Sequence, residues 1–163
     1  MNPRFACVIV AGIALAFLAA GCQQPKSEQA SALSAEDTAA IGKTIDSAIT
    51  TYVAKDLDKY LINFSPDMVN MEYDRRFLGI AEFRDKHVKP EMETSTMTTY
   101  KVADRRIQGR GSFAYVDERE IVAWKENSGK SHSSDSFWAS YILEKQTDGS
   151  WKIVQLHFSG PPL

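Results

Sequence analysis

The sequence predicts an α+β domain in which a group of helices comes before an antiparallel sheet. Two observations predict this class. In residues 34–93 most apolar side chains recur at helical spacing, whereas from residue 96 onward they lie in long runs rich in Thr, Val and Tyr. Short turns separate these later runs, and strands joined in this way form antiparallel meanders rather than parallel βαβ units.

Three helices and a small hairpin are expected before the sheet. Ser34 and Asp37 form a capping-box pattern that begins the first helix, and Asp56 caps a shorter second one. Gly79 leads into the third helix, in which Pro90 closes the helix or falls in its last turn. The hairpin is expected between the second and third helices.

Four long strands are expected in the second half of the chain, at residues 96–109, 112–126, 135–145 and 151–159. The last strand is apolar on both faces, which is typical of a strand covered on both sides. The helices can cover one face of the sheet, and we expect a second subunit to cover the other.

The composition is that of an ordinary globular protein. The chain has 163 residues, of which 44% are apolar and 25% charged, enough for one domain with its own core. The formal net charge is −2. No basic surface is therefore expected, and no nucleic acid is predicted as a partner.

The first 22 residues have the layout of a secretory signal peptide. Arg4 precedes an uncharged apolar run from Phe5 to Ala20, and small residues lead to Cys22. An uncleaved membrane anchor is the alternative, because the run approaches spanning length. Small residues before a cysteine resemble the lipobox of bacterial lipoproteins, although Ala19 stands where that family usually has Leu.

The lipobox resemblance implies that residues 1–21 are removed and that Cys22 carries a lipid as the first mature residue. Gln23 follows, which implies an exported protein anchored on the periplasmic face of the outer membrane in a Gram-negative organism. Residues 22–33 are polar and predict a tether, and residues 34–163 are predicted to form the folded domain.

The chain closes on one motif, Asp148-Gly149-x-Trp151-x-Ile153-Val154-x-x-His157-x-Ser159, followed by Gly160-x-Pro162. With the elements before it, this ending resembles the NTF2-like cone fold, in particular its SnoaL-like branch and the association domain of calcium/calmodulin-dependent kinase. The resemblance extends over residues 35–162. It implies a curved sheet wrapped around the helices, a pocket at the open end of the cone and a homodimer through the outer sheet face. Such folds host many functions, so none is fixed by it.

His157 is the first candidate for chemistry. Strict alternation puts it on the strand face of Trp151 and Ile153, with Phe158 on the opposite face. The resemblance implies that Phe158 lines the cone, so His157 is expected to point toward the dimer side. A packing role is favoured over a general base, because no partner carboxylate is evident.

Four consecutive charges in the strand at residues 112–126 are the second candidate. Asp117 and Arg119 lie on one strand face, and Glu118 and Glu120 on the other. Charges on a covered strand need a reason. Either Asp117 and Arg119 reach a pocket, or the strand turns out into solvent.

The association domain binds carboxylate-type ligands through arginines, and the matching positions here are Asp117, Tyr141 and Phe158. None is arginine, which implies an aromatic, partly acidic pocket for a neutral or weakly cationic apolar ligand. Tyr52 and Tyr60 could face the same cavity, with plain core packing as the alternative. The predicted ligand-binding residues are Tyr52, Tyr60, Asp117, Arg119, Tyr141 and Phe158.

No catalytic residue, cofactor or metal site is predicted, since His87, His132 and His157 lie on different elements without ligand spacing. The leading hypothesis is a lipid-anchored envelope protein whose domain binds a small apolar molecule or a protein partner without catalysis. Two alternatives stay open. One is an isomerase or dehydratase that uses Asp117 as base and a tyrosine as donor, and the other is an oligomeric assembly module whose cavity is filled by its own side chains.

Overall fold

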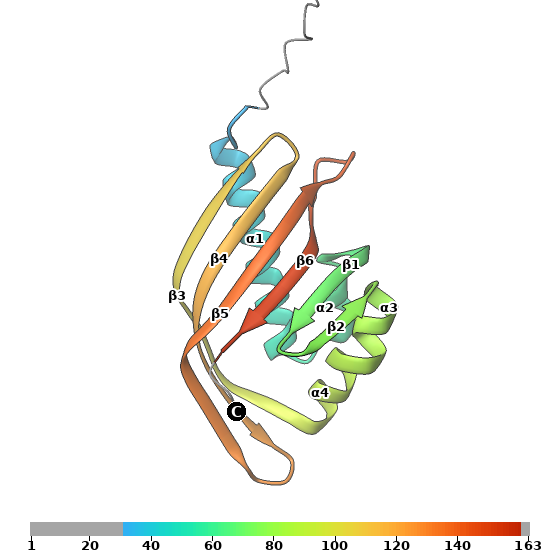
Figure 1. The fold of residues 1–163 in the computed structure, drawn as a ribbon, viewed down its shortest axis with the longest axis vertical. Helices are drawn as coiled ribbons and strands as arrows, with labels where there is room; N and C mark the ends of the chain where they lie inside the picture. The colour runs from blue at the N-terminus through green and yellow to red at the C-terminus, as the bar shows by residue number, and fades with distance from the viewer. Residues whose placement is uncertain (1–30, 161–163) are drawn as a thin grey trace, which may run out of the picture.

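The computed structural model describes residues 31–160, in which a group of helices packs against one curved sheet (Figure 1). The predicted signal peptide, the predicted lipid site Cys22 and most of the predicted tether lie outside the described residues. Between residues 31 and 160, every helix is too short or too polar to cross a membrane.

The helical group begins at Ser34, as the capping-box pattern predicts. The Ser34 hydroxyl accepts a hydrogen bond from the Asp37 backbone N–H at 3.0 Å and caps α1 (Ala35–Val53). The Asp56 carboxylate caps α2 (Leu57–Leu61) in the same way. Both helices therefore begin where the sequence predicts.

The third predicted helix is continuous but changes its winding. It consists of α3 (Ile80–Phe83), one π-helical stretch, η1 (Arg84–Val88), and α4 (Lys89–Thr94). Pro90 accounts for the wider stretch, because it has no N–H to donate to the preceding turn. The Lys89 N–H donates to the carbonyl of Arg84, five residues before it, which is the hydrogen-bond pattern of a π-helix.

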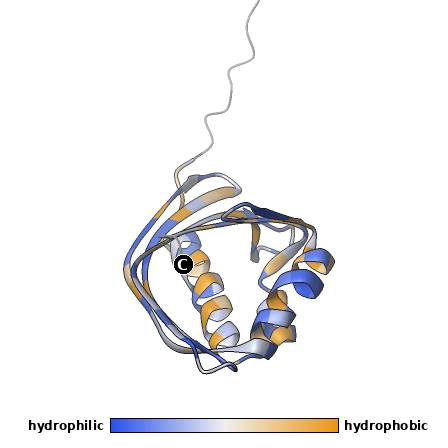
Figure 2. Ribbon diagram, turned by 60° about the horizontal axis from the view of Figure 1, so that its bottom comes forward, coloured by the Kyte–Doolittle hydropathy of each residue, from blue (hydrophilic) through white to orange (hydrophobic). Residues whose placement is uncertain are grey.

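All strands belong to one sheet, in the order β2-β1-β6-β5-β4-β3. β1 and β6 are parallel, whereas the other neighbours are antiparallel. The small hairpin β1–β2 therefore extends the four long strands, and the sheet curves around α1 (Figure 2), which confirms the predicted α+β cone. The strands are β1 (Phe64–Glu72), β2 (Arg75–Leu78), β3 (Ser95–Arg110), β4 (Phe113–Glu126), β5 (Ser131–Lys145) and β6 (Trp151–Ser159).

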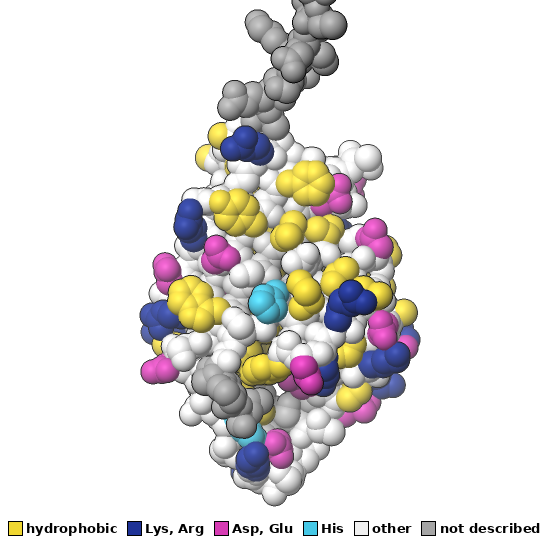
Figure 3. Space-filling model, viewed as in Figure 1, with side chains coloured by type: hydrophobic (Ala, Val, Ile, Leu, Met, Phe, Trp, Pro, Cys, Tyr) yellow, Lys and Arg dark blue, Asp and Glu magenta, His cyan; other side chains and the backbone are white. Residues whose placement is uncertain are grey.

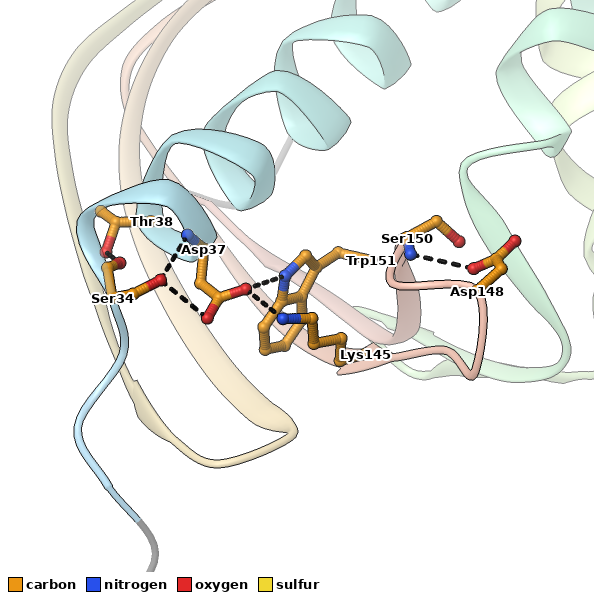
Figure 4. A network of polar contacts seen from close by, with 7 residues as sticks. All are labelled: Ser34, Asp37, Thr38, Lys145, Asp148, Ser150 and Trp151. Carbon is orange, nitrogen blue, oxygen red and sulfur yellow. Dashed lines mark hydrogen bonds and ion pairs between the residues drawn. The ribbon is translucent and has the colours of Figure 1, made fainter.

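The final strand is central to the sheet, between β1 and β5. Its Trp151 and Ile153 side chains are buried in the core between the concave sheet face and α1, and burial of such side chains stabilises a fold by about 1.5–3 kcal/mol each. The Trp151 indole N–H donates to Asp37 at 3.2 Å, and Lys145 Nζ donates to the same carboxylate oxygen at 2.6 Å (Figure 4). These bonds tie the start of α1 to β5 and β6.

A bulge in β6 corrects one prediction about strand faces. The register against β5 shifts between Ile142 and Leu143, which inserts one extra residue into β6. Ile153 and Phe158 consequently both face the inside, and His157 is exposed on the outer face. Strict alternation, which put His157 on the face of Ile153, was wrong for this reason, although the expected outward direction of His157 is found.

Candidate functional site

A cavity of about 400 Å³ lies on the concave side of the sheet, between the helices and the strands. Its volume falls in the range of small-molecule pockets. Most of its wall is apolar or aromatic. Apart from tyrosines, its titratable and charged side chains are Glu72, Asp74, Arg75, His87, Glu91 and Glu120.

Four of the six predicted ligand-binding side chains line this cavity: Tyr52, Tyr60, Tyr141 and Phe158. The rings of Tyr52 and Tyr60 lie 5.4 Å apart, and those of Tyr141 and Phe158 lie 6.5 Å apart. The helices and the sheet therefore each contribute an aromatic pair to the wall.

Asp117 and Arg119 do not reach the cavity, so their predicted place in a pocket is wrong. Both lie on the outer face of β4, where Asp117 accepts a hydrogen bond from the Ser140 hydroxyl at 3.0 Å. Arg119 donates to the Asp135 carbonyl at 3.1 Å. The position-by-position match to the association domain had suggested the opposite direction for this strand face.

The inner face of β4 instead carries Glu118 and Glu120, neither of which was predicted as a site residue. Ala114, Val116 and Val122 are buried at alternate positions, and Glu118 and Glu120 continue the same alternation with no exposed surface. The signal was present in the sequence, since a period of two that begins and ends in buried apolar residues predicts the direction of the residues between them.

Glu118 is held by a chain of charges that leads out to the surface. Arg105 on β3 donates from Nε to Glu118 Oε1, and its terminal nitrogen donates to Asp46 on α1 at 2.7 Å. The Asp46 side chain is 63% exposed, whereas Glu118 is fully buried. Burial raises the pKa of Glu118, and the Arg105 guanidinium offsets part of that rise.

Glu120 lies at the cavity, and no Lys, Arg or His between residues 31 and 160 forms an ion pair with it. Its Oε1 accepts from the Tyr141 hydroxyl at 3.3 Å, and Tyr100 lies in the same cavity wall. Burial is the main cause that raises the pKa of Glu120 to about 8, and the charge of Glu118 adds to the rise. At neutral pH, Glu120 is therefore an uncharged acid between two tyrosines.

A second polar group lies in the helical wall of the cavity. His87 Nε2 is 2.7 Å from Glu72 Oε2 and 3.8 Å from Glu91 Oε2. The His87 ring stacks on Phe77, with centroids 5.0 Å apart. Burial raises the pKa of Glu91. The π-helical stretch η1 carries His87 on this face.

The remaining histidines lie outside the cavity. His132 is 2.7 Å from Glu126 and stacks on Trp124, and His157 is on the outer sheet face. In the part of the chain that the structure describes, no group of three or more His, Cys, Asp or Glu side chains is arranged to hold a metal ion.

Comparison with known sequences gives one family match. The model of a family described as a SnoaL-like domain matches residues 41–163. No curated protein matches the sequence.

Solved structures of similar fold include a ketosteroid isomerase-like protein from Erwinia carotovora atroseptica, with 19% identity, a TM-score of 0.69 and coverage of 80% of this chain and 100% of that one. An NTF2-like superfamily protein from Salmonella enterica has 17% identity, a TM-score of 0.66 and coverage of 79% and 95%. An NTF2-like protein of unknown function from Pseudomonas putida has 16% identity, a TM-score of 0.64 and coverage of 79% and 89%. At these identities the likeness shows a shared fold alone.

Proposed function

This chain belongs to the SnoaL-like family, and from that premise we propose that its domain binds one small, largely apolar molecule in the cavity. The molecule carries a neutral hydrogen-bond acceptor, such as a carbonyl oxygen, that meets the hydroxyls of Tyr100 and Tyr141. The observation that carries the proposal is the fully buried Glu120, which accepts from the Tyr141 hydroxyl and lines, with Tyr100, a largely aromatic wall.

Pocket chemistry favours this ligand class for two reasons. Apolar walls gain about 25 cal/mol for each Å² of apolar surface that a ligand removes from water. A few convergent polar groups then fix its orientation. Binding without turnover is the primary proposal, because His87 in the cavity wall lies 2.7 Å from the Glu72 carboxylate and is stacked on Phe77.

Binding is tested with acetylnaphthalene, a neutral aromatic ketone, and with naphthalene, which has the same apolar body without the acceptor. Trp124 lines the cavity, so tryptophan fluorescence reports occupancy, and calorimetry gives the affinity and stoichiometry. The ketone is expected to bind about tenfold more tightly, the value of one net hydrogen bond of about 1.4 kcal/mol. Tyr141→Phe reduces this preference, and Trp138→Phe on the outer face leaves it unchanged. Equal affinities for the two compounds, or no binding of either, contradict the proposal.

A second candidate function is proton transfer beside a carbonyl group, as in isomerase or dehydratase chemistry. The observation that favours it is His87, with Glu72 and Glu91 beside it, in the wall of the same cavity as Glu120, because a histidine and a carboxyl group can act as base and acid. Asp117 cannot be the base of such a reaction, because its side chain lies on the outer face of the sheet and does not line the cavity. Exchange of the ketone's acetyl hydrogens in deuterium oxide, lost in His87→Gln but kept in Asp117→Asn, identifies turnover.

The third alternative, an assembly module whose cavity is filled by its own side chains, does not fit an open volume of about 400 Å³. We do propose a homodimer through the outer sheet face. Phe113, Tyr115 and Trp138 are 53%, 45% and 46% exposed, and Figure 3 shows hydrophobic side chains among charged ones on this side of the molecule. Exposed aromatic residues of this kind are typical of association surfaces.

We further propose that the mature protein is anchored to the cell envelope through a lipid on Cys22. The support is the small-residue pattern before Cys22 and the polar stretch after it. Intact mass measurement of the protein extracted from membranes is expected to show loss of residues 1–21 and an added diacylglyceryl mass. Cys22→Ala is expected to lack the lipid, and a mature start elsewhere contradicts the proposal.

A further inference from the structure

Glu118 and Arg105 do not line the cavity. Glu118 lies two residues from Glu120 on the inner face of β4, and Arg105 is bonded to Glu118. We infer that the Glu118–Arg105 ion pair determines the ligand class of the cavity. Glu118 and Glu120 share one negative charge, and Arg105 keeps that charge on Glu118. Glu120, which lines the cavity, therefore stays uncharged, and the cavity selects neutral acceptors over amines. This inference rests on the proposed binding function.

The geometry favours one proton on the two carboxyls. Glu118 and Glu120 are two residues apart on the inner face of β4, both fully buried. The charge of Glu118 disfavours ionisation of Glu120, and two ionised carboxylates would both be acceptors only. Neither Oε2 atom receives a hydrogen bond from any donor among residues 31–160. A proton on one of the two carboxyls removes the repulsion between two buried negative charges.

The surroundings decide which carboxyl keeps that proton. The groups that act on Glu120 are Tyr60 from α2, Tyr100 from β3, Glu118 from β4 and Tyr141 from β5. All except Glu118 are neutral hydroxyls. Glu118, by contrast, accepts from the Arg105 guanidinium, which Asp46 of α1 holds from the other side. A neighbouring cation favours the ionised form, so the charge stays on Glu118 and the proton on Glu120.

Ligand choice follows from the position of the proton. An uncharged Glu120 leaves the wall neutral, and the tyrosine hydroxyls can turn to an incoming carbonyl. An ionised Glu120 would accept from both hydroxyls, withdraw those donors from a ligand and attract a cationic amine. Glu118 and Arg105 are positioning residues in this sense, because neither lines the cavity.

Glu118→Gln separates this role from simple packing. The amide keeps the shape, removes the repelling charge and offers an N–H to Glu120. Glutamate labelled at its side-chain carboxyl carbon reports the protonation of Glu120 by NMR without any ligand, and Glu120→Gln assigns the signal. The titration midpoint is expected near pH 8 in the wild type and below about pH 7 in Glu118→Gln. Asp117→Asn removes an equal charge from the other face of β4 and is expected to leave the midpoint unchanged.

The ligand readout uses acetylnaphthalene and naphthylmethylamine at about pH 7.5. Glu118→Gln is expected to weaken the ketone about tenfold and strengthen the amine about tenfold, reversing the wild-type order. Asp46→Asn is a surface variant that keeps the fold. Without the Asp46 charge, the positive charge of Arg105 is less neutralised and favours ionisation of Glu120 more strongly. The titration midpoint of Glu120 is therefore expected to fall by about half a pH unit, less than in Glu118→Gln.

The possible failures are distinguishable. A midpoint unchanged by Asp46→Asn, or by Glu118→Gln in a folded variant, overturns the inference whatever the ligands do. A midpoint that falls while neither compound binds the wild type removes the proposed binding function, and with it the selective role inferred here. A midpoint that falls while the ligand order stays unchanged overturns the selective role alone.

Discussion

Glu120→Gln is predicted to remove a pH-dependent loss of stability. Folding raises the pKa of Glu120 from 4.5 to about 8, so the folded state holds a proton that the unfolded state releases between these values. The free energy of unfolding therefore falls as the pH rises through this window and is constant above it. The window spans about 3.5 pH units, and at about 1.4 kcal/mol per unit the loss is about 5 kcal/mol.

The amide of Glu120→Gln resembles the neutral acid, since its N–H can donate to Glu118 and its carbonyl can accept from Tyr141. The variant is therefore expected to lack this loss. Urea unfolding followed by tryptophan fluorescence, at about pH 5 and about pH 9, measures the difference. Its stability relative to the wild type is expected to rise by about 4 kcal/mol across that range, because about 3 pH units of the window lie above pH 5. Asp117→Asn is expected to follow the wild type. Parallel curves for wild type and Glu120→Gln would refute the buried proton.

Three further predictions concern the scaffold. Gly42→Ala in α1 is expected to raise the unfolding free energy by about 0.5–1 kcal/mol, because a Cβ there meets only side-chain atoms at 3.7 and 3.9 Å; a lower urea midpoint would contradict this. Gly109→Ala is expected to lower the unfolding free energy by about 2 kcal/mol or more, because a Cβ there would clash with the Phe113 carbonyl oxygen. Urea unfolding measures this loss as well. Trp138→Glu is expected to halve the mass seen by light scattering, and an unchanged mass argues against the outer-face dimer.

The helices and long strands were predictable because their signals are local. Ser34 and Asp56 cap the helices that follow them, since a capping side chain needs only the backbone three residues ahead. The pairing of β1 with β6 is parallel and joins segments far apart in the sequence, and no local pattern encodes such a contact. The bulge near Val154 likewise depends on how β5 and β6 meet, so alternation counted along β6 alone misplaced His157 relative to Ile153.

The candidate site was predictable in part for the same reason. The aromatic lining residues follow ordinary apolar patterns, and their faces could be inferred. The direction of Glu118 and Glu120 was encoded in the alternation of β4, but charged residues are seldom buried, so the charges themselves argued against an inward direction. The buried charge of Glu118 is paired with Arg105, which lies on another strand. A partner across the sheet is not visible in any short stretch of sequence.

The buried carboxyl pair is better explained by binding than by stability. A buried ion pair often contributes less to stability than apolar side chains of similar volume, and Glu120 adds a loss of up to about 5 kcal/mol at alkaline pH. Core apolar residues at both positions would have continued the pattern of Val116 and Val122 and avoided this loss. Apolar residues cannot provide a polar group at the cavity whose protonation state depends on the Arg105–Glu118 ion pair. A stabilising role predicts that Glu120→Gln and Glu120→Leu behave alike toward ligands, whereas the role inferred here predicts that only Glu120→Gln keeps the preference for a ketone.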